Sequence, residues 1–188
     1  MNELVILAAL LQAPAYGYAL KKTAGLIFGN RALHPNIVYP LLKKFVQNGW
    51  VEQSSTPGDR GQTRKQYRIT AAGRKYLIQE LSNFDAHAAS DDGAFLFRVA
   101  FFHALPKQKR QEILASREQF LNSRATELAR LSDATQADSF PAIALNRVMA
   151  LVRDELRWLR KLRREIEFKK GDATCRPLHI PRGTAHQF

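Results

Sequence analysis

The chain has 188 residues, of which 45% are hydrophobic and 24% charged, with 10 glycines and 8 prolines. These proportions are typical of a folded globular protein and exclude a disordered chain. The 29 Lys and Arg exceed the 17 Asp and Glu, which gives a formal net charge of +12. A polyanion is therefore the leading class of partner, although a membrane surface or a ribosome would attract the same charge.

The single cysteine, Cys175, excludes an intramolecular disulfide and fits a reducing compartment. The apolar run over residues 4–11 has no basic stretch before it and is predicted to be a core helix, not a signal peptide. No segment approaches the ~20 apolar residues that a bilayer requires. We therefore expect a soluble, cytoplasmic protein without a membrane partner.

Three helices are predicted at the start of the chain. Residues 4–11 form the first, and Pro14 separates it from a second over residues 18–28. Pro35 suits the first turn of a third helix, and Gly49 suits its end. The predicted core-facing residues of this third helix are Ile37, Leu41, Leu42 and Phe45.

A hairpin and a fourth helix are predicted next. Two β-prone runs, residues 50–54 and 63–69, flank the turn formers of residues 57–61. Thr70 is placed to cap a helix that follows the hairpin. Three helices, a hairpin with a basic tip and a further helix are the layout of a winged helix-turn-helix, whose third helix enters the major groove.

The second half of the chain is predicted to be helical throughout. Asp91 and Asp92 suit a helix start better than a paired-carboxylate site. A short helix is predicted over residues 95–105, and a long one over residues 107–131. A third helix is expected to begin at Pro141.

We therefore expect a mainly α protein. A winged helix-turn-helix domain with a two-stranded wing would occupy residues 1–84. An all-helical dimerisation and effector domain would occupy residues 91–170, and residues 171–188 would form an irregular tail.

An apolar stripe runs along the last predicted helix at three-, four- and seven-residue steps. Its principal members are Val148, Val152, Leu156, Leu159 and Ile166. Such a stripe fits either a monomeric core or a seam between two subunits. We favour the seam, because one winged helix reads few base pairs and a twofold dimer on two half-sites supplies the missing specificity.

The N-terminal region resembles the PadR family of transcriptional regulators over residues 4–82. The similarity is carried by residues 17–20 (GYAL), 36–44 (NIVYPLLKK), 49–51 (GWV) and 64–74 (RKQYRITAAGR), with Tyr-Pro-x-Leu at 39–42 the most diagnostic. His34 and Asn36 stand where the family often has Ser and Gly, and Gln66 stands where an aromatic residue is common. The resemblance implies a homodimer that binds a dyad operator, typically as a repressor released by a small aromatic compound.

The predicted DNA contacts divide by chemistry. The residues expected to neutralise phosphates are Lys43, Lys44, Arg60, Arg64 and Lys65. Asn36 and Tyr39 are candidates for base edges, and Gln62 suits either role. Tyr39 could instead pack under the wing, and Tyr18 could contact a phosphate or pack in the core.

Other functions are less well supported. The chain has no phosphate-binding loop, dinucleotide fingerprint, zincin or hydrolase motif, so we expect neither an enzyme nor a cofactor. Cys175, His179 and His186 are poor evidence for a metal site. Trp158 lies off the apolar stripe and is the candidate contact for an aromatic effector. A winged-helix module for RNA or protein contacts is the alternative function.

Overall fold

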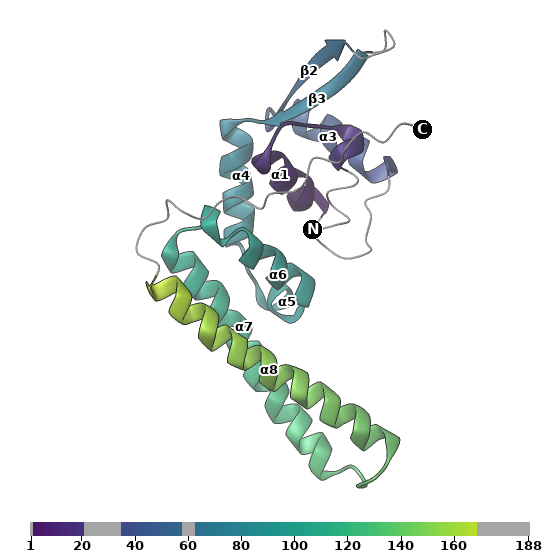
Figure 1. Ribbon diagram of the computed structural model, residues 1–188, viewed down its shortest axis with the longest axis vertical. Helices are drawn as coiled ribbons and strands as arrows, with labels where there is room; N and C mark the ends of the chain where they lie inside the picture. Colours follow the sequence, from purple (N-terminus) through teal and green to yellow (C-terminus); the bar gives the residue numbers. More distant parts are fainter. Residues whose placement is uncertain (1, 21–34, 58–62, 169–188) are drawn as a thin grey trace. The chain divides into compact units, whose positions relative to one another are not determined.

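The computed structural model describes residues 2–20, 35–57 and 63–168. The chain divides between Asn83 and Phe84 into two compact units. The N-terminal unit combines helices with a small antiparallel sheet, and the C-terminal unit is helical (Figure 1). This composition confirms the predicted fold class, a mainly α protein with a winged N-terminal region.

The first helix, α1 (Asn2–Gln12), is the centre of the N-terminal unit. All its residues from Leu4 to Leu10 are buried, as expected of a helix that is apolar all round. Helices α3 (Pro35–Gln47) and α4 (Ala71–Ser82) contact it, as does strand β3 (Thr63–Ile69). The strongly buried residues that these elements add to the core are Leu42, Phe45, Ile69, Leu77 and Leu81.

Helix α3 begins at Pro35 and ends before Gly49, as predicted. Gly49 has φ +69°, in the left-handed region that favours glycine. Its N–H donates to the carbonyl of Val46 at 3.1 Å, and the N–H of Trp50 donates to the carbonyl of Phe45 at 2.9 Å. These two bonds form a Schellman motif, which stops the helix and turns the chain into the wing.

The face of α3 that points into the core is shifted from the predicted one, and Leu41 is only half-buried. Val38 is buried, whereas Ile37 is exposed. The reason is geometric: Val38, Leu42 and Phe45 lie on one line of the helix, and Ile37 lies a quarter of a turn away from it. Of the second predicted helix, residues 17–20 are helical, and the rest lies outside the described residues.

The sheet has three strands in the order β1-β3-β2. Strand β2 (Val51–Pro57) pairs antiparallel with β3, with Val51 opposite Ile69 and Pro57 opposite Thr63. The predicted hairpin is therefore confirmed. Strand β1, Ala15–Tyr16, pairs with the other edge of β3 and corrects the expected two-stranded arrangement. A two-residue strand is too short to show an alternating pattern in the sequence.

Helix α4 is capped by Thr70, as predicted. The Thr70 hydroxyl accepts a hydrogen bond from the Gly73 N–H at 3.0 Å and donates one to the Gly49 carbonyl at 2.7 Å. The first turn of α4 lies so close to the wing that a Cβ built on Gly73 would be 2.1 Å from the carbonyl oxygen of Trp50. Thr70 and Gly73 therefore tie α4 to the end of α3 and the start of β2.

The C-terminal unit consists of two short helices and a long helical hairpin (Figure 1). Its elements are α5 (Ala86–Ser90), α6 (Asp92–Ala100), a 3₁₀ turn (Phe102–Ala104), α7 (Lys107–Asp133) and α8 (Phe140–Phe168). Asp91 caps α6 as the sequence predicts, since its carboxylate accepts from the Ala94 N–H at 2.9 Å. The single helix expected over residues 95–105 is instead the end of α6 followed by the 3₁₀ turn.

Helices α7 and α8 pack against each other along their apolar faces. Leu114 and Leu121 of α7 are buried, as are Val152 and Leu159 of α8. None of the helices within the described ranges is long and apolar enough to cross a membrane.

Candidate nucleic-acid interface

Helix α3 presents a polar side away from the core. Asn36, Tyr39, Lys43 and Gln47 are all exposed on it. At 100° per residue these positions lie opposite the buried line of Val38, Leu42 and Phe45. The helix therefore carries hydrogen-bonding groups and a cation on the side that is open to a ligand, as the sequence predicted.

Tyr39 combines packing with exposure. A Cβ built on Gly17 would lie 2.9 Å from Cε1 of Tyr39, so the ring rests against the bare backbone of Gly17. Tyr39 is nevertheless 54% exposed. Burial raises the pKa of the neighbouring Tyr67 on β3, with a smaller electrostatic contribution from Tyr39. Tyr18, at the start of the second helix, is exposed and does not belong to the core.

The wing adds basic side chains to the same unit. Arg64 and Lys65 are exposed on β3, opposite Thr56 and Ser55 of β2. Arg60 and Gln62, which the sequence analysis also assigned to DNA, lie outside the described residues.

Lys44 differs from Lys43 in having an acidic partner. Its Nζ donates a hydrogen bond to Oε1 of Glu3 on α1 at 2.7 Å. That hydrogen bond and the charge of Glu3 raise the pKa of Lys44. The sequence analysis grouped Lys44 with the phosphate contacts, but it could not anticipate this pair because 41 residues separate the two partners.

Two residues near the interface were missed by sequence reasoning. Glu3 and Tyr16 were given no role from the sequence. In the structure Tyr16 is exposed on β1, opposite Gln66 of β3. Neither residue has a signal of its own in the sequence, since a lone acid and a two-residue strand have no periodicity.

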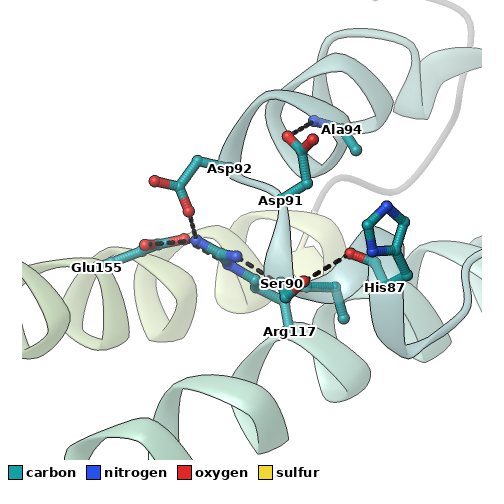
Figure 2. A network of polar contacts seen from close by, with 8 residues as sticks. His87, Ser90, Asp91, Asp92, Ala94, Arg117 and Glu155 are labelled. Carbon is teal, nitrogen blue, oxygen red and sulfur yellow. Dashed lines mark hydrogen bonds and ion pairs between the residues drawn. The ribbon is translucent and has the colours of Figure 1, made fainter. Parts of the chain in front are cut away.

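The C-terminal unit contains a buried arginine that connects four helices (Figure 2). Arg117 of α7 is 1% exposed and donates from Nε and Nη2 to the carboxylate of Glu155 on α8, at 2.8 and 2.9 Å. It also donates to the Ala89 carbonyl of α5 at 2.7 Å and to the Asp92 carboxylate of α6. The guanidinium lies 5.3 Å from the ring centre of Phe95. A buried cation with this many partners is a structural centre of the unit.

Part of the predicted subunit seam on α8 is buried within the C-terminal unit itself. Val152 and Leu159 are buried in the single chain, and Val148, Leu156 and Ile166 are half-buried. The physical reason is that this stripe faces α7, which the sequence could not place. The structure thus assigns Val152 and Leu159 to the core of the chain, which is the alternative that the sequence analysis left open.

A second apolar stripe on α8 is exposed. Its members are Phe140, Ile143, Leu151 and Trp158. At 100° per residue they lie within about 80° of one another, and Val152 lies at least about 100° around the helix from each of them. The ring of Trp158 meets Phe95 edge-on, with 6.1 Å between ring centroids.

No group of three or more potential metal ligands occurs among residues 2–20, 35–57 and 63–168. Cys175, His179 and His186, which the sequence analysis weighed as metal ligands, lie outside these ranges.

The fold and the cations on α3 and β3 define a winged helix-turn-helix protein with a helical C-terminal unit. Residues 6–79 match the family model described as the transcriptional regulator PadR-like family. The chain belongs to this family, and it is a transcriptional regulator.

Similar solved structures include regulators from archaea and bacteria. A putative transcriptional regulator from Thermoplasma acidophilum is 34% identical and is matched over 42% of this chain and 75% of its own, with a TM-score of 0.40. Bacillus subtilis PadR in complex with operator DNA is 17% identical over 87% of this chain and 98% of its own, with a TM-score of 0.44. The same protein in complex with p-coumaric acid is 16% identical over 88% and 94%, with a TM-score of 0.39. No curated protein sequence matches the chain.

Proposed function

We propose that this regulator binds double-stranded DNA sequence-specifically and represses transcription from a dyad operator. The observation that carries the proposal is the exposed polar side of α3, with Asn36, Tyr39 and Lys43, in the same unit as the basic strand β3. A helix of this kind fits the major groove, while the wing reaches the backbone.

The side chains have different tasks in this proposal. Lys43, Arg64 and Lys65 neutralise phosphates, and Arg60 would extend this set at the tip of the wing. Asn36 and Tyr39 contact base edges or fix the register of the helix in the groove. Phosphate contacts supply affinity for any sequence, and the two α3 side chains supply the preference for one sequence.

A footprint on the promoter beside the protein's own gene tests the proposal directly. We expect protection of two half-sites related by a dyad, and tighter binding to this duplex than to structured RNA or single-stranded DNA of the same length. Replacing Arg64 and Lys65 by alanine should weaken binding and make its salt dependence shallower by about 0.9 in log–log slope per lost phosphate contact. Preference for RNA over duplex DNA would instead favour the alternative function.

We further propose that a second copy of the chain covers Phe140, Ile143 and Leu151, three members of the exposed stripe on α8. These large apolar side chains lie on one side of a single helix and have no cover within the described part of the chain. We take this group of exposed apolar side chains as the interaction site. A twofold dimer formed through this stripe would present two winged helices to the two half-sites.

The oligomeric state tests the dimer. Ile143→Asp and Leu151→Asp should give monomers by analytical ultracentrifugation at micromolar concentration, because each buries a charge in the seam. Arg153→Asp is the matched control, since it introduces the same side chain at an exposed position outside the stripe and should leave the dimer intact. A wild-type protein that is monomeric at this concentration would refute the dimer proposal.

A small aromatic compound is the proposed effector, with Trp158 as a contact. The Trp158 ring packs edge-on against Phe95 and remains partly exposed, so a flat ligand could stack on it. In a Trp50→Phe background Trp158 is the sole tryptophan. Its fluorescence should change as the compound is added, in parallel with release of the operator. Release without a fluorescence change would place the effector elsewhere.

A further inference from the structure

The two adjacent lysines of α3 have different surroundings. Lys43 is exposed on the middle of the polar side, and no partner is found for its ammonium among the described residues. Lys44 is hydrogen-bonded to Glu3 at 2.7 Å, although the Lys44 side chain is 50% exposed and that of Glu3 31%. The ammonium of Lys44 is therefore open to solvent on one side and held by a carboxylate on the other.

In the proposed DNA complex, the position of Lys44 on α3 would place it beside a phosphate backbone. It lies about 100° around the helix from Lys43, at the edge of the polar side that faces α1. When a recognition helix enters the major groove, its middle faces the bases and its edges face the two backbones. The carboxylate of Glu3 and a phosphate would therefore compete for the same ammonium group.

Glu3 also lies close to Tyr76 on α4. Burial, together with the nearby carboxylates of Glu80 and Glu3, raises the pKa of Tyr76. Tyr76 in turn stacks on Trp50, with 3.7 Å between the ring centroids. The carboxylate of Glu3 therefore lies near both Lys44 of α3 and Tyr76 of α4.

We propose that Glu3 limits the affinity of the protein for duplex DNA of any sequence by withholding Lys44 from the phosphate backbone. The inference rests on the proposed function of α3. With a formal net charge of +12, the protein is attracted to any duplex, and such sites compete with the operator in a genome. Withholding one phosphate contact lowers this sequence-independent part of the affinity at the operator and at other sites alike, and it leaves the base contacts of α3 unchanged.

Replacing Glu3 by glutamine tests the proposal, because the amide keeps the shape of the side chain and removes its charge. Glu3→Gln should bind duplex DNA of unrelated sequence more tightly than wild type. The plot of log affinity against log salt should steepen by about 0.9, the value of one added phosphate contact. This slope makes the gain in affinity shrink by about threefold between 50 and 200 mM salt.

Two lysine variants complete the experiment. Lys44→Ala should leave the salt slope unchanged in the wild-type background and should cancel the steepening in the Glu3→Gln background. Lys43→Ala is the matched control, and it should make the slope shallower by about 0.9 in both backgrounds. A melting curve for each variant shows whether the fold is retained.

Three results would overturn the inference. One is an unchanged slope in Glu3→Gln. Another is weaker binding together with a lower melting temperature, which would give Glu3 a purely structural role. The third can be obtained even if Glu3→Gln fails to fold: a shallower slope for Lys44→Ala in the wild-type background, which would mean that Lys44 already contacts a phosphate. If neither the wild type nor Lys43→Ala shows salt-dependent binding to duplex DNA, the proposed function fails as well.

Discussion

Replacing Glu155 by glutamine should destabilise the C-terminal unit. The Glu155 carboxylate accepts two hydrogen bonds from Arg117, whose side chain is 1% exposed, while Glu155 itself is 26% exposed. In the variant the buried guanidinium keeps Asp92 as its only anionic partner among the described residues, and the Asp92 side chain is 72% exposed. The perturbation therefore leaves the buried cation with one of its three hydrogen bonds to carboxylates.

The size of the expected stability loss follows from the burial of Arg117. Breaking a buried ion pair by removing one partner costs about 3–5 kcal/mol. Because the glutamine oxygen still accepts one bond and Glu155 is partly screened by water, we expect a loss of about 2–3 kcal/mol. The neighbouring Asp154 gives a matched control on the same helix. It pairs with Arg157, and their side chains are 73% and 69% exposed, so Asp154→Asn should cost less than about 0.5 kcal/mol.

Urea unfolding followed by Trp158 fluorescence, in a Trp50→Phe background, measures the C-terminal unit alone, because Trp50 and Trp158 are the only tryptophans and lie in different units. The urea concentration at the unfolding midpoint should be lower for Glu155→Gln and should stay near the wild-type value for Asp154→Asn. If the two variants lose equal stability, the Arg117 centre does not stabilise the unit and the reasoning from burial is wrong.

Three further predictions concern the N-terminal unit and can be measured by thermal or urea unfolding. Thr70→Ala should lose about 1 kcal/mol because it removes the cap of α4, and Thr70→Ser should retain most of the stability; equal losses would contradict the capping role. Gly49→Ala should cost about 1–2 kcal/mol from its positive φ alone, since no atom lies within 4 Å of a Cβ there. Gly73→Ala should cost more, because its Cβ would collide with the Trp50 carbonyl, and the reverse order would refute this comparison. Burial raises the pKa of Tyr67 in the folded protein, so stability should fall as the pH rises above the ordinary tyrosine pKa, where the unfolded chain loses its proton first; Tyr67→Phe should reduce that fall.

Much of the interface could be predicted from the sequence because its signals are local. The Tyr-Pro-x-Leu stretch of α3, the glycine that ends this helix and the threonine that starts α4 depend on backbone conformations and neighbours within a few residues. The exposed positions of Asn36, Tyr39 and Lys43 follow from helical spacing alone. The family assignment rests on the same local motifs.

The features that escaped prediction depend on contacts between distant residues. The sequence contains two apolar stripes on α8 but does not say which of them α7 covers, and Val152 and Leu159 turned out to face inward. Glu3 reaches Lys44 across 41 residues, and Arg117 reaches Glu155 across 38. Charge pairs of this kind require the helices to be placed first, since attraction between side chains depends on distance in space.

The sequence by itself determined that this protein has a basic winged helix-turn-helix followed by long helices, because periodicity, caps and turn residues are properties of short segments. Only the tertiary structure decided which cation of α3 is paired with a carboxylate, which apolar stripe of α8 is exposed, and where the buried arginine finds its anions. These decisions depend on burial and on distances between elements, and a linear pattern contains neither.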